Sequence, residues 1–91
     1  MVNQIRQAKF RGKKYKIRWT KEEGLGSCEH PKTKGKAITL HPELSGNELI
    51  RVAVDEAIHA CFWELDNDSV GEASESIAKF LHDLGIKHVQ D

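Results

Sequence analysis

The sequence predicts a small α+β domain in which a short antiparallel or mixed sheet of two to three strands packs against two helices. Three observations predict it: apolar and basic residues alternate over 13–20, a short apolar run follows at 37–41, and two longer segments, about 47–63 and 68–84, have helical periodicity. Ninety-one residues suffice for one core, so we expect a single domain over 1–91.

The first part of the chain predicts two strands. Residues 1–12 are polar and basic without a clear period, which predicts a loosely ordered lead-in. Tyr15, Ile17 and Trp19 then alternate with basic residues, as expected of a strand with one buried face. Residues 22–36 are rich in glycine, proline and charge and predict a long loop, after which 37–41 predicts the second strand.

The rest of the chain predicts two helices. Ser45 and Glu48 match a capping box, so the first helix is expected to begin just after Ser45. Gly85 is well placed to end the second helix in a left-handed conformation. The second helix has an apolar stripe that we expect to face the core, formed by Val70, Ala73, Ile77, Phe80, Leu81 and Leu84.

The first helix is apolar almost all round, which is typical of a helix covered on more than one side. Glu48, Asp55 and His59 form a narrow polar line on it. Polar groups on a covered helix must be paired with each other, solvated through a cleft or bound to a metal ion. We therefore expect a functional site on this polar line.

Asp55 and His59 are four residues apart, so both side chains leave the helix on one face and can reach a single metal ion. Glu56 lies beside them and can hold a water molecule at the edge of such a site. A charge ladder of Arg51, Asp55 and His59 would satisfy the same groups without a metal. Spacing alone favours the charge ladder, but the sequence is compatible with both the ladder and a metal site.

The same residues belong to a longer stretch that resembles a known protein family. The run I-T-L-H-P-E-L-S-G-N-E-L-I-R-V-A-V-D-E-A-I-H-A-C-F-W-E-L-D, followed by a helix ending F-L-H-D-L-G-I, resembles small phage- and bacteria-encoded proteins similar to minimal gluzincin-type zinc metallopeptidases. The resemblance covers about residues 11–88 and is most specific at E-A-I-H-A-C. It departs from the H-E-x-x-H motif of such enzymes at Asp55, which stands where the motif has its first histidine.

The resemblance implies a zincin-like fold and a role for each matched residue. His59 would be a zinc ligand, Glu56 the general base that takes a proton from water, and Asp55 the other ligand from this helix. An aspartate ligand would shift the preference of the site toward magnesium, manganese or calcium. Glu72 on the second helix is the expected third metal ligand, with Glu48 as a competing carboxylate.

Three functions follow from these patterns. The first is metal-dependent hydrolysis of a peptide or protein, and the second is a degenerate enzyme of the same fold that binds a protein partner. The third is nucleic-acid binding, which we disfavour because the net charge is zero. It would use basic residues interleaved with aromatic ones in the first strand region: Lys9, Phe10, Arg11, Lys13, Lys14, Tyr15, Lys16, Arg18, Trp19 and Lys21.

The remaining expectations concern location and assembly. Two cysteines without C-x-x-C spacing, no signal-peptide pattern and no membrane-spanning run predict a cytoplasmic protein, in the host cytoplasm if phage-encoded, without a membrane partner. A homodimer is one way to complete the walls of a substrate cleft on so short a chain. Three other histidines lack ligand spacing and are expected at the surface: His30, His82 and His88. His41 ends the second strand and is expected in solvent, with a position near the candidate site on the first helix as the alternative.

Overall fold

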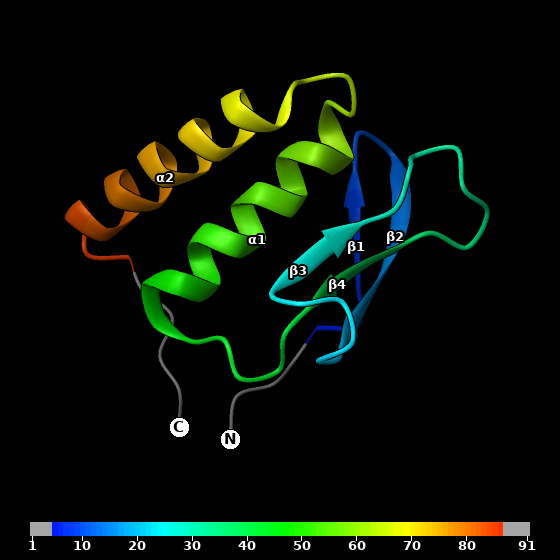
Figure 1. The fold of residues 1–91 in the computed structure, drawn as a ribbon, viewed down its shortest axis with the longest axis horizontal. Coiled ribbons are helices and arrows are strands. Elements are labelled where there is room, and N and C mark those ends of the chain that lie inside the picture. The colour runs from blue at the N-terminus through cyan, green and yellow to red at the C-terminus, as the bar shows by residue number, and fades with distance from the viewer. Residues whose placement is uncertain (1–4, 87–91) are drawn as a thin grey trace.

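A computed structural model describes residues 5–86 and confirms the α+β class (Figure 1). Four strands form one mixed sheet in the order β1-β2-β4-β3, so the expectation of two to three strands was too low. The elements in chain order are β1 (Gln7–Phe10), β2 (Lys13–Trp19), β3 (Gly26–Cys28), β4 (Ala37–Leu40), α1 (Gly46–Cys61) and α2 (Asn67–Asp83).

The two strands missed by the sequence analysis are the short strands at the sheet edges. Strand β1 lies within the expected lead-in, and a two-residue turn at Arg11 and Gly12 joins it to β2. Both turn residues have positive φ, 52° and 81°, as a tight hairpin requires. Strand β3 lies within the expected loop. Each strand is too short for its alternation of apolar and polar residues to be recognised.

The core lies between the sheet and α1. Strands β2 and β4 form the centre of the sheet and pair in parallel, with Ile17 opposite Ile38 and Trp19 opposite Leu40. Helix α1 lies between the sheet and α2, which packs on α1 alone among the described elements (Figure 1). The buried core cluster comprises Tyr15, Ile17, Ile38, Leu40, Leu44, Val52 and Ala60.

Helix α2 is rotated relative to the expected orientation. Its buried residues are Val70, Ser74 and Ala78, whereas Phe80 and Leu84 of the expected apolar stripe are exposed. The expectation that the whole stripe faces the core was therefore wrong. Helix α2 meets only another helix and does so through a narrow line of small side chains, which lets two helix axes approach closely.

The helix ends show which capping signals were used. Both helices begin and end within two residues of the expected bounds. The capping box is absent, because the Ser45 side chain makes no cap hydrogen bond. Asp66 caps α2 instead, since its carboxylate accepts from the backbone N–H of Ser69 at 2.9 Å. Gly85 has a φ of 87°, which confirms the left-handed end of α2.

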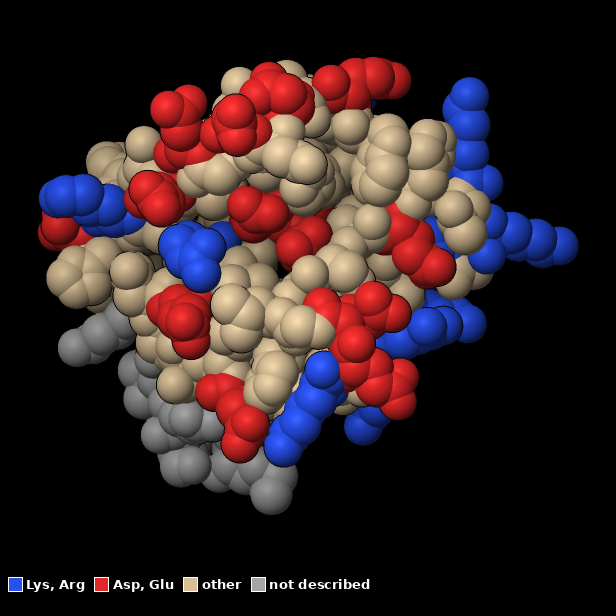
Figure 2. All heavy atoms as spheres, viewed as in Figure 1, with Lys and Arg blue, Asp and Glu red and all other residues tan. Residues whose placement is uncertain are grey.

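Charge is unevenly distributed over the fold. Acidic side chains gather over α2 and the exposed side of α1, whereas most basic side chains lie over the sheet and its loops, with acidic ones among them (Figure 2). In the described part of the chain, neither helix is long and apolar enough to cross a membrane.

Candidate metal centre

Helix α1 brings the three predicted residues Asp55, Glu56 and His59 into one group. One ligand atom from each lies within 4.8 Å of the other two. The i, i+4 spacing places Asp55 and His59 one above the other, and Glu56 lies one step round the helix toward the sheet. Histidine nitrogen and carboxylate oxygen are common donors to zinc and related divalent ions.

Asp55 connects the two helices. Its Oδ2 lies 3.4 Å from Nε2 of His59, and its Oδ1 lies 3.1 Å from the hydroxyl oxygen of Ser74 on α2. Ser74 is fully buried, and its hydroxyl also lies 2.7 Å from the carbonyl oxygen of Val70, so its one proton serves one acceptor at a time. Ser74 on α2 therefore orients the Asp55 carboxylate, a contact that the sequence did not predict.

The alternative charge ladder is present only in part. Within residues 5–86, Arg51 forms no ion pair with Asp55. The distance of 3.4 Å between Oδ2 of Asp55 and Nε2 of His59 also exceeds the 2.7–3.2 Å of a good hydrogen bond. The Asp55 and His59 side chains are thus close together, but no short hydrogen bond joins them.

Glu56 is a buried carboxyl group without a protein partner. Its residue is 7% exposed, and no group among residues 5–86 donates a hydrogen bond to its side chain. Burial, with a smaller effect of the nearby Asp55 charge, raises its pKa to about 7. A carboxyl group with this pKa can exchange a proton near neutral pH, which is what a general base requires.

Gly26 allows strand β3 to lie directly against Glu56. A Cβ atom at this position would lie 2.8 Å from Cγ1 of Val52, 3.1 Å from Oε2 of Glu56 and 3.2 Å from the Thr39 carbonyl oxygen. Any larger side chain would push the strand away from α1. The Gly24-Leu25-Gly26 run suggested a loop in the sequence; its second glycine is a packing requirement instead.

An open cleft of about 470 Å³ leads to Glu56 and His59. Cys28 lies at this cleft. Burial, and to a smaller extent the charges of Glu56 and Glu29, raises the pKa of Cys28 to about 12. Its thiol is therefore protonated at neutral pH, and we assign it no role as a nucleophile. The cleft is lined by Gly26, Ser27, Cys28, Glu56, His59, Trp63, Leu65 and Asn67.

The geometry of the group is compatible with a divalent metal ion. Two ligand atoms each about 2.1 Å from a tetrahedral zinc ion lie about 3.4 Å apart. The Asp55 and His59 donor atoms have this separation. The buried Glu56 carboxyl group, which lacks a hydrogen-bond donor among residues 5–86, is a further polar group that a cation or its water would satisfy.

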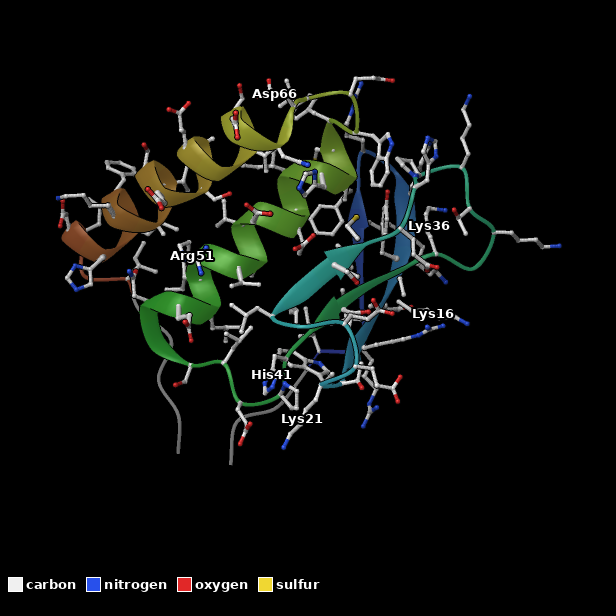
Figure 3. All side chains as sticks on the ribbon, viewed as in Figure 1. Lys16, Lys21, Lys36, His41, Arg51 and Asp66 are labelled. Carbon is white, nitrogen blue, oxygen red and sulfur yellow. The ribbon has the colours of Figure 1, made fainter. Side chains whose placement is uncertain are left out.

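The other candidate residues lie elsewhere. Glu72, the expected third ligand, and Glu48, its competitor, are exposed and lie outside the group. Figure 3 places His41 at the opposite end of α1 from Asp66, away from the cleft. His82 is at the surface as expected, and His88 lies outside the described residues. His30 is exposed but packs against Trp63, with 4.9 Å between ring centroids.

The aromatic residues of the basic strand face inward. Tyr15 is fully buried in the core, and the Trp19 indole donates a hydrogen bond to the carbonyl oxygen of Ile5. The outer face of β2 presents only cations, namely Lys14, Lys16 and Arg18. Nucleic-acid bases therefore cannot stack on Tyr15, and Trp19 is only partly exposed.

Comparison of the chain with protein-family models, curated proteins and solved structures finds no match.

Proposed function

We propose that the protein is a metal-dependent hydrolase acting on peptides, in which α1 supplies the metal ligands and the general base. One observation supports this most: Oδ2 of Asp55 and Nε2 of His59 are 3.4 Å apart, beside the buried Glu56 carboxyl group, which has no hydrogen-bond donor within residues 5–86. The gluzincin resemblance of E-A-I-H-A-C favours Glu56 and His59, and places Asp55 where the motif has its other ligand from this helix.

Each residue has a distinct role in this proposal. Asp55 and His59 hold the ion, and Ser74 keeps the Asp55 carboxylate turned toward His59. A bound zinc ion would act as a Lewis acid and increase the acidity of a water molecule in the cleft. Glu56, with a pKa of about 7, accepts the proton of that water and then passes it to the leaving amine.

Strand β3 is suited to position an extended peptide. It is an edge strand that pairs with β4 on one side, and its residues Ser27 and Cys28 line the cleft beside Glu56. An extended peptide can pair with an exposed edge through its backbone, independently of its side chains. The peptide bond would then lie across the cleft opening, next to the general base.

Zinc-loaded protein incubated with a mixed peptide library tests the proposal, with cleavage followed by mass spectrometry. Glu56→Gln should lower the cleavage rate by roughly 100-fold or more, the usual contribution of a general base. Glu72→Gln removes the same charge from an exposed site and should leave the rate unchanged.

Two results would redirect the proposal. Zinc binding without cleavage by the wild-type protein would support the degenerate enzyme that only binds a partner. Cleavage that survives Glu56→Gln at the wild-type rate would contradict the role of Glu56.

A further inference from the structure

A second cavity, of about 280 Å³, lies on the other side of Trp63 from the candidate metal centre. Basic side chains dominate its lining: Arg11 and Lys13 come from the β1-β2 hairpin, and His30 and Lys32 come from the loop that follows β3. Glu64 is the one acidic residue among its lining residues. This basic pocket is a local feature, since the whole chain has no net charge.

Arg11 is held in place at the edge of the basic pocket. It has a φ of 52° in the hairpin turn, a conformation that favours asparagine, aspartate or glycine over arginine. Its Nη1 donates to the Cys61 carbonyl oxygen at 3.0 Å, and its guanidinium lies 5.4 Å from the centre of the Phe62 ring. The guanidinium has five N–H donors, so most stay available to an anion.

The cations of the basic pocket have no carboxylate partner within residues 5–86. Within residues 5–86, Arg11, Lys13 and Lys32 take part in no ion pair. Lys13 and Lys32 are exposed and approach the same cavity from two separate segments. Bringing like charges together opposes folding, and an anionic ligand would relieve this repulsion.

Trp63 connects the basic pocket to the candidate metal centre. Its ring is 4.9 Å from that of His30 and 6.3 Å from that of His59, between centroids, and it lines both cavities. An extended peptide advances about 3.3 Å per residue, so two or three residues cover the distance across an indole ring. A peptide lying at Glu56 can therefore place a side chain in the basic pocket.

We infer that the basic pocket binds a carboxylate of the peptide, so that the preferred ligands are acidic peptides with the charged group two or three residues from the bond at Glu56. This inference rests on the proposed function for the position of the bond, but the binding preference itself needs no turnover. Arg11 supplies a fixed donor, Lys13 and Lys32 supply mobile charges, and Trp63 covers the peptide backbone between the two sites.

Binding of fluorescently labelled peptides to the full chain tests the inference by anisotropy. Three peptides share one sequence: one has an internal glutamate and an amidated end, one has glutamine there, and one has glutamine and a free carboxyl end. The glutamate peptide should bind about tenfold more tightly than the amidated glutamine peptide, the usual effect of one charge-assisted hydrogen bond. Tight binding of the third peptide would identify the carboxylate as that of the chain end.

Matched variants locate the preference. Lys13→Gln and Lys32→Gln should each reduce the preference for the acidic peptide severalfold. Lys14→Gln and Lys34→Gln make the same charge change beside them in sequence, outside the pocket lining, and should leave it unchanged. Equal affinity for all three peptides, or equal losses in all four variants, would overturn the inference. Tighter binding of a single-stranded oligonucleotide at the same salt concentration would also overturn it.

The two proposals can fail separately. A preference for acidic peptides without cleavage would leave the basic pocket assigned and remove the hydrolase. Cleavage without any preference for acidic peptides would leave the hydrolase and remove the basic pocket.

Discussion

Helices α1 and α2 are similar in length, and each buries one polar side chain between small apolar ones. On α2 this residue is Ser74, whose hydroxyl has two acceptors within reach, the carbonyl oxygen of Val70 and the carboxylate of Asp55. On α1 it is Glu56, whose carboxyl group has no hydrogen-bond donor among residues 5–86. A buried hydroxyl group with partners is ordinary packing, whereas a buried carboxyl group without them opposes folding.

The difference separates a residue whose contacts explain its burial from one for which we propose a function. Ser74 is explained by the contacts it makes, and its removal should mainly loosen the position of Asp55. Contacts do not explain the burial of Glu56, since burial raises its pKa to about 7 and no group among residues 5–86 donates a hydrogen bond to its carboxylate.

The largest contrast is expected in catalysis. If the zinc-loaded protein cleaves a peptide, Glu56→Gln should reduce the rate by roughly 100-fold or more, whereas Ser74→Ala should reduce it by about tenfold. Initial rates at saturating zinc provide the measurement. Equal losses in the two variants would contradict the distinction between a general base and a positioning residue.

The pH dependence of stability should show the burial of Glu56. Its pKa rises from 4.5 in the unfolded chain to about 7 in the fold, so the folded state binds the extra proton between these values. The free energy of unfolding of metal-free protein should therefore fall as pH rises from about 4.5 to 7, by at most about 3 kcal/mol. Urea titrations should show this fall in wild type and its absence in Glu56→Gln.

Packing at α2 should distinguish its buried line from its exposed stripe. Ala78 is buried against α1, so Ala78→Leu should cost about 1–3 kcal/mol through overpacking. Phe80 is 62% exposed, so Phe80→Ser should change the free energy of unfolding by less than about 0.5 kcal/mol. A large loss in Phe80→Ser with none in Ala78→Leu would indicate the helix orientation that the apolar stripe had suggested.

Ser74→Ala in metal-free protein should have a smaller effect than Ala78→Leu. Loss of its buried hydrogen bonds should lower the free energy of unfolding by about 1 kcal/mol. The control Ser76→Ala lies on the exposed side of the same helix and should have no measurable effect. Thermal or urea unfolding of both variants measures the difference.

The sequence predicted what depends on local pattern and missed what depends on contacts between distant segments. Both helices, both central strands and the three neighbouring residues of the candidate metal centre follow from periodicity and spacing within 20 residues. The role of Gly26 depends on how close β3 comes to α1, and that of Ser74 on the rotation of α2. Neither is encoded in a short motif.

The rotation of α2 is a second feature that the sequence pattern could not predict. Its apolar stripe is longer and more hydrophobic than its line of small residues, so pattern alone favours burial of the stripe. Packing on a single helix favours the small residues instead, and Glu72 stays exposed.

The central claim is that Asp55 and His59 share one metal ion beside Glu56. Anomalous X-ray scattering at the zinc absorption edge, measured on crystals grown with excess zinc, tests it most directly. We expect one strong peak per chain, about 2.0–2.2 Å from Nε2 of His59 and from Oδ2 of Asp55. No peak there, or peaks only at His30 or His41, would contradict it.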